Sequence, residues 1–156
     1  MTYAPITFKV RILSSDTSKI GQLTSANRRQ LLRVMGREFY KITMGTFGAS
    51  GTNRASDWPP LTKRYQKRIN YFGPPKLVLK GNLRSSIRVT VDNDRYAEIG
   101  THIPYAGVHQ FGGGNNIPAR PYFPIVSGGV RKQLTPYAKT QIANAVSREL
   151  IQILKS

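Results

Sequence analysis

Alternation of apolar and polar side chains predicts strands near the start and in the middle of the chain. In the segment 6–13 every second residue is apolar, which is typical of a strand with one buried face. The segment 85–91 alternates in the same way. Asp92-Asn93-Asp94 then favours a turn before a returning strand at 96–100. We therefore expect one strand near the start and a β-hairpin later in the chain.

Apolar residues spaced by three and four predict two long helices. The first covers 25–44 and ends at Gly45, with Leu31, Met35 and Phe39 on its apolar face. The last begins at Thr135-Pro136, a helix cap followed by a first-turn proline, and reaches Leu154. A shorter basic helix is expected at 61–69, and the proline-dense segment 118–126 favours an edge strand.

This order of elements predicts an α+β fold. We expect a small, mostly antiparallel sheet packed against the long helix of the N-terminal half and the C-terminal helix. A length of 156 residues is usual for one domain, so a single domain spanning 1–156 is expected. Small, polar and glycine-rich segments predict mobile loops near 47–57, 71–75 and 111–116.

The charge is extreme, with 24 Lys and Arg against 7 Asp and Glu, a formal net charge of +17. Such a chain is expected to meet a polyanion, either a nucleic acid or an acidic protein surface. The absence of cysteine excludes disulfides, cysteine-zinc sites and thiol catalysis, and fits folding in a reducing cytoplasm. No apolar run approaches the ~20 residues that span a bilayer, so no membrane segment is expected.

Side chains suited to catalysis are few. His102 and His109 could form a ribonuclease-like acid–base pair, but no carboxylate pattern flanks them. Asp92 and Asp94 fit the hairpin turn better than a Mg²⁺ site, and the triple glycine at 112–114 lacks the lysine of a phosphate loop. We expect no catalytic residue, cofactor or metal.

Four cations share one face of the first long helix at a spacing of four. They are Arg29, Arg33, Arg37 and Lys41. Their mutual repulsion disfavours the helix by roughly a few tenths of a kcal/mol per pair, and only Glu38 lies near to offset it. This basic row is therefore expected to face DNA or an acidic partner, although a merely solvated face remains open. No recognised nucleic-acid module accompanies it, so any DNA contact should be to the phosphate backbone.

Three further segments form a recognisable combination. The first is Trp58-Pro59-Pro60-Leu61 with Tyr65, and the second runs from Leu79 through Gly81-Asn82-Leu83 to Ile87. The third is Tyr105-Ala106, then His109-Gln110-Phe111-Gly112, then Pro118-Ala119-Arg120-Pro121-Tyr122-Phe123. Together they resemble the phage virion morphogenesis family, the tail completion proteins of Mu-like and related tailed phages. Minor tail or neck components of siphophages are similar.

The resemblance implies a non-enzymatic virion protein that completes the tail or joins it to the head. Such a protein is expected in the virion neck or tail, assembled in the host cytoplasm as a homo-oligomeric ring, a hexamer, around the DNA channel. Its partners would be other neck proteins on the portal or adaptor side and on the tail terminator or tube side, with non-specific contact to packaged DNA. The alternatives are a stand-alone basic nucleic-acid-binding domain and, third, a basic nuclease.

The motif residues carry physical expectations of their own. Those expected in the motif core are Trp58, Leu61, Tyr65, Gly81, Leu83 and Ile87, with Gly81 in a backbone conformation closed to other residues or allowing close packing. Candidates for a subunit or partner interface are Pro118, Arg120, Pro121, Tyr122 and Phe123, the two aromatics being expected to be exposed. Arg120 is expected to pair with an acid on its own chain or on a neighbour, so Arg120→Ala should impair assembly more than folding.

Overall fold

The computed structural model describes seven stretches of the chain. These are residues 6–11, 23–48, 57–70, 77–92, 94–114, 116–128 and 131–155. The loops expected at 47–57 and 71–75 fall almost wholly outside these stretches, as does the end of the first expected strand.

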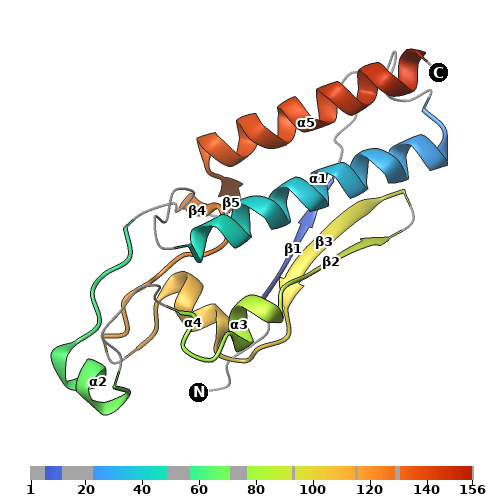
Figure 1. Cartoon of the computed structure of the whole chain (residues 1–156). Coiled ribbons are helices and arrows are strands. Elements are labelled where there is room, and N and C mark those ends of the chain that lie inside the picture. The colour runs from blue at the N-terminus through green and yellow to red at the C-terminus, as the bar shows by residue number, and fades with distance from the viewer. Residues whose placement is uncertain are drawn as a thin grey trace.

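A three-stranded antiparallel sheet forms one layer of the molecule (Figure 1). Its strands are β1 (Ile6–Val10), β2 (Arg88–Asp92) and β3 (Tyr96–Thr101), in the order β1-β3-β2. Phe8 pairs with Ile99, and Val89 pairs with Ile99 from the other side, so apolar side chains line up on one face. The predicted first strand and hairpin are confirmed. Apolar and polar residues alternate along these strands, and one face of the sheet is therefore apolar and buried.

Helix α1 (Ser25–Thr46) covers that apolar face, and helix α5 (Pro136–Lys155) lies antiparallel on the far side of α1 (Figure 1). Gly36 lets α1 approach the sheet closely, because a Cβ built there would lie 2.6 Å from Val89 Cγ1. Thr24 and Thr135 cap the two helices by accepting hydrogen bonds from Asn27 N and Ala138 N, at 3.1 and 3.2 Å. The α+β class is confirmed, with α5 packed on α1.

Helix α1 continues past Gly45, where its end was expected. The hydroxyl of Thr43 donates to Phe39 O at 2.8 Å, and that of Thr46 reaches Tyr122 O at 2.9 Å. The last turn is therefore held by one hydrogen bond within the helix and one tertiary hydrogen bond, which outweigh the weak helix propensity of glycine.

Short elements gather at the end of the molecule where α1 finishes (Figure 1). They are α2 (Lys63–Arg68), α3 (Asn82–Ser85), α4 (Ala106–Phe111) and a hairpin of β4 (Ile125–Gly128) and β5 (Arg131–Leu134). Helix α2 is shorter than the expected 61–69 because Thr62 caps it, accepting from Tyr65 N. Strand β5 was not expected, and the strand in the proline-rich segment begins only at Ile125, where the prolines end.

Candidate functional site

The basic row (Arg29, Arg33, Arg37 and Lys41) lies on the exposed side of α1, away from the buried Met35 and Phe39. Lys41 forms an ion pair with Glu38 at 3.6 Å. Arg33 and Arg37 form no ion pair with any residue that the structure describes.

The neighbouring Arg28 points elsewhere. Its guanidinium binds Asp94 in the hairpin turn at 2.7 and 3.1 Å, and hydrogen bonds from Arg28 and Ser25 lower the pKa of the Asp94 carboxyl. One of the five cations between 28 and 41 is thus used inside the fold.

The proline-rich segment is not the exposed patch that the sequence suggested. Tyr122 and Phe123 are fully buried, and the expectation that they are exposed is wrong. Phe123 packs against Phe8 and Phe39 at ring-centroid distances of 5.1 and 5.9 Å, and Tyr122 packs against Phe47 at 5.5 Å. Burial also raises the pKa of Tyr122. These two rings therefore form the centre of the core, and they cannot offer an interface without unfolding it.

Arg120 is also buried, at 6% exposure. Its Nε and Nη2 donate to the carbonyls of Pro59 and Pro60, both at 3.1 Å, and burial lowers its pKa. No acid pairs with it among the described residues. The expected acidic partner is replaced by two carbonyls, because the Trp58-Pro59-Pro60 segment lies directly beside it. Arg120 thus ties two of the recognised motifs together within one chain.

Gln110 makes a second tie that the sequence did not reveal. It is 2% exposed, and its Oε1 accepts hydrogen bonds from the backbone N–H groups of Tyr122 and Phe123 at 3.1 and 2.9 Å. Its Nε2 donates to Phe123 O at 3.3 Å. One side chain thus bonds three of the four backbone polar groups of Tyr122 and Phe123, and Phe123 O also accepts from Ile125 N at 2.7 Å. These bonds hold α4 and the proline-rich segment together.

Of the expected motif core, Trp58, Leu83 and Ile87 are buried, and Trp58 Nε1 donates to Pro121 O at 2.8 Å. Gly81 has φ +72°, which confirms a conformation that favours glycine. Leu61 is only partly buried, and Tyr65 departs furthest from the expectation. It is 37% exposed, with Arg68 over its ring at 4.9 Å, so its assignment to the core is wrong.

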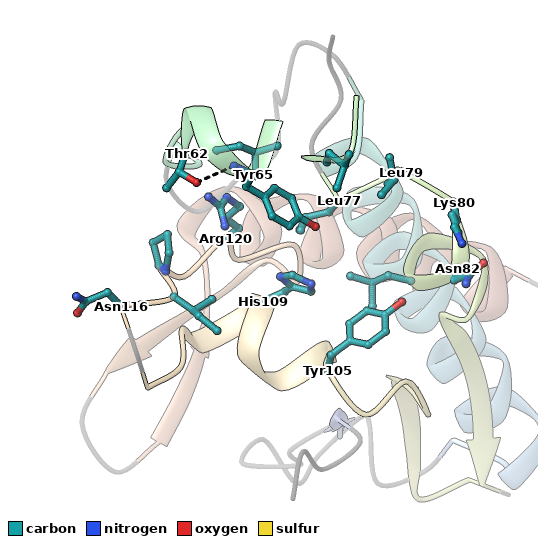
Figure 2. A pocket seen from close by; sticks show the side chains of 16 residues that line it. Thr62, Tyr65, Leu77, Leu79, Lys80, Asn82, Tyr105, His109, Asn116 and Arg120 are labelled. Carbon is teal, nitrogen blue, oxygen red and sulfur yellow. Dashed lines mark hydrogen bonds between the residues drawn. The ribbon is translucent and has the colours of Figure 1, made fainter. Parts of the chain in front are cut away.

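The motifs enclose a half-open groove with a volume of 620 Å³ (Figure 2). Its walls come from α2 and the residues just before it, from the segment 77–83, from α4, and from the segment 116–120. Most of the lining is apolar, and it includes Leu61, Ile69, Leu77, Leu79, Leu83, Ile117 and Pro118. Pro118 is exposed at its edge, whereas Pro121 is only partly exposed. The groove is a surface that the motif segments build together.

The ionisable side chains of the groove are basic or phenolic. Lys80, His109 and Arg120 line it with Tyr65 and Tyr105, and none of the described residues lining it is acidic. Figure 2 shows His109 between Arg120 and Tyr105, whose ring lies 5.5 Å from the imidazole. Burial and the nearby Arg120 charge lower the pKa of His109, and its Nδ1 is buried without a hydrogen-bond partner.

The remaining features of the described chain add no chemistry to the groove. His102 is exposed ahead of α4 and does not line it. Gly112 has φ +81°, and Gly113 bridges to Ile117, so the described part of the glycine-rich turn is closed on itself. Within the described stretches no three metal-ligating side chains cluster. No helix in those stretches has the length and apolar character needed to cross a bilayer.

Comparison with known sequences decides the family. The sequence model described as the phage virion morphogenesis family matches residues 12–151, which includes every motif above. The chain belongs to the phage virion morphogenesis family. Its role is therefore that of a virion structural or assembly protein, as the resemblance implied.

A curated relative adds distant similarity without a function. An uncharacterized protein of Methanocaldococcus jannaschii is 36% identical over 84 residues, which cover 49% of this chain and 62% of that protein. The chain thus spans less than two thirds of the length of this relative. No solved structure matches at a significant level.

Within this family member, sequence reasoning found the motifs but missed what they build. Gln110 stands inside a recognised motif, and its amide gave no periodic signal of burial. The groove was missed because its four walls lie far apart in the sequence.

Proposed function

We propose that this virion protein is a tail completion or head–tail joining component that forms a homo-oligomeric ring, a hexamer, around the DNA channel of the neck. Its neighbours would be the portal or adaptor on one side and the tail terminator or tube on the other. It would act without catalysis, cofactor or metal. The observation that carries the proposal is the exposed basic row on α1 in a member of a virion morphogenesis family.

The charge pattern suits a channel that DNA crosses without being read. Arg33 and Arg37 are exposed and lack ion pairs within the described chain, so their charges are available to phosphates. Phosphate contacts are independent of sequence and depend steeply on salt. In a ring, several copies of the same row would surround the DNA, so each copy would need only a few weak contacts.

Particle composition tests the location. We expect mass spectrometry of purified virions to detect the protein, and a reconstruction of the neck to place it in a closed ring. Absence of the protein from both heads and tails would overturn the proposal.

Duplex binding tests the role of the basic row. Replacing Arg33 and Arg37 by Ala should reduce the slope of log affinity against log salt by about 1.8, since each phosphate contact contributes about 0.9. The matched control replaces Lys63 and Arg64 of α2, two exposed cations outside the row, and should leave the contribution of the row intact. Equal reductions in both double variants would mean that the net charge, and not the row, binds DNA.

The stand-alone nucleic-acid-binding domain is favoured by the same exposed arginines and makes a different prediction. Such a domain should hold free duplex at about 150 mM salt as a monomer, where screening already weakens surface charges. A neck protein needs no such affinity, because assembly holds it beside the DNA. Tight binding by monomers, together with absence from virions, would favour the alternative.

A further inference from the structure

One wall of the groove, the segment 58–69 that we call the arm, is held to the rest of the described chain at its beginning. Trp58 is buried, and its Nε1 donates to Pro121 O at 2.8 Å. The carbonyls of the two prolines that follow accept from Arg120. Helix α2 makes up most of the remaining arm and has no buried residue, and Figure 1 shows it apart from α1 and the sheet. A segment with so little buried surface opens locally at a lower free energy than the core.

His109 lies beside Arg120 in a setting that disfavours a second positive charge (Figure 2). Its carbonyl accepts from Arg120 N at 2.7 Å, and its Nδ1 is buried without a hydrogen-bond partner. A protonated imidazole carries a hydrogen on both nitrogens, so it would place a buried N–H donor without an acceptor near a guanidinium that is 6% exposed. Burial and the Arg120 charge accordingly lower the pKa of His109.

No carboxylate offsets these two cations among the described residues that line the groove. The ionisable groups that face His109 are Tyr65 from α2, Lys80 from the segment 77–83, and Tyr105 from the beginning of α4. Asp57, the acid next to the arm, is exposed and forms no ion pair with a described residue. A charge gained by His109 would therefore be relieved only by movement.

We propose that protonation of His109 detaches the arm from the core and opens the groove. The arm is then a wall that stays closed near neutral pH and loosens in acid. This inference concerns a conformational change within one chain, and it does not depend on where the protein lies in the virion.

The contacts around the pair determine which part moves. Gln110 binds the backbone of Tyr122, so the backbones on either side of the pair are held in place. The Arg120 side chain can move away from the imidazole, and it then loses its hydrogen bonds to the two proline carbonyls. Each proline fixes its own φ and restricts the residue before it, so 58–60 moves as one stiff piece that includes Trp58. Helix α2 follows, because no buried residue of its own holds it.

The direction and size of the effect follow from the difference in proton affinity between the two states. In the open state His109 has the ordinary pKa of 6.5, and in the closed state its pKa is lower because of burial. Protons therefore favour the open state below about pH 6.5 and have no effect well above it. Between pH 8 and 5 the equilibrium constant for opening should rise by up to about 30-fold, the factor by which an ordinary imidazole favours its protonated form at pH 5.

Trp58 reports the opening, because it is the single tryptophan of the chain and its indole N–H gives one NMR signal. Hydrogen exchange of this N–H is measured in the full chain from pH 8 to 5 and divided by the rate in the urea-unfolded chain. Protection should fall by up to about 30-fold in the unchanged protein and by less than about twofold in His109→Gln. The matched control is His102→Gln, which replaces an exposed histidine outside the groove and should behave as the unchanged protein.

Low concentrations of urea show whether the opening is local. Detachment of the arm exposes little surface, so urea should leave exchange at Trp58 nearly unchanged while accelerating exchange of the Phe39 amide in α1. Equal acceleration at the two sites would overturn the inference, because Trp58 would then be exposed only by global unfolding.

Two other results would also overturn it. One is protection of Trp58 that changes by less than about twofold between pH 8 and 5 in the unchanged protein, and the other is an equal fall in His109→Gln. If His109→Gln does not fold, the imidazole C–H signal decides, since His102→Gln retains His109 as its single histidine. That signal should titrate below the ordinary histidine range, and titration at about pH 6.5 would contradict the closed state described here.

Discussion

Replacing Gln110 by Leu should be among the most damaging single changes in the groove region. Leucine has a similar size, but it removes the acceptor for the N–H groups of Tyr122 and Phe123 and the donor to Phe123 O. The two buried N–H groups would then lack partners, whereas Phe123 O keeps the hydrogen bond that it accepts from Ile125 N at 2.7 Å. Each such group costs about 1–3 kcal/mol, and burial of the added methyl groups returns about 1 kcal/mol. We expect the free energy of unfolding to fall by about 1–5 kcal/mol.

Urea denaturation followed by circular dichroism measures this change. For a chain of this size, 1 kcal/mol corresponds to about 2–4 °C in Tm, so Tm should fall by roughly 2–20 °C. The slope of the free energy against urea should stay the same, because the folded state loses hydrogen bonds and not its architecture. Gln133→Leu, an exposed position on β5, is the matched control and should change stability by less than about 0.5 kcal/mol.

A loss below about 0.5 kcal/mol for Gln110→Leu would refute this reasoning. It would mean that the two backbone N–H groups find other partners, and that Gln110 does not hold the proline-rich segment against α4. The structural role assigned to the His109-Gln110-Phe111 motif would then have to be abandoned.

Three further changes test other parts of the account. Burial lowers the pKa of His109 in the folded chain, so below about pH 6.5 the unfolded chain takes up the proton more readily. The free energy of unfolding should therefore decrease as the pH is lowered from 8 to 5. Urea denaturation should show a smaller decrease for His109→Gln than for the unchanged protein. Gly81→Ala should cost about 1–2 kcal/mol in thermal unfolding through backbone strain alone, since no atom lies within 4 Å of the added Cβ, and an unchanged Tm would contradict it. Arg120→Ala should lower the free energy of unfolding by about 2–3 kcal/mol, because it removes two hydrogen bonds from a charged donor. If the variant keeps its stability and loses only ring assembly, the interface role first expected for Arg120 would be restored.

Local patterns predicted the regular elements well. The alternation at 85–91 gave the hairpin, the spacing of Leu31, Met35 and Phe39 gave α1, and Thr135-Pro136 marked the beginning of α5. Each of these signals is carried by neighbouring residues, so it can be seen in one sequence without tertiary information.

The exposure of individual side chains was harder to predict from the sequence. Prolines around Tyr122 and Phe123 suggested an exposed arm, but Phe8, Phe39 and Phe47 enclose the two rings from distant segments. Conversely, Tyr65 looked like a core residue and instead lines the groove, because Thr62 and the prolines before it place the short α2 on the surface. Burial of these residues depends on contacts between segments that no local pattern records.

We propose that the face of α1 that carries Arg33 and Arg37 is where part of the net charge of +17 acts, and one measurement tests that proposal most directly. A reconstruction of the neck in the intact particle should show a closed ring of this chain with the basic row turned toward the DNA channel or an acidic neighbour. A map in which the ring is present but the row meets only solvent would contradict the account, and so would a neck that lacks the chain.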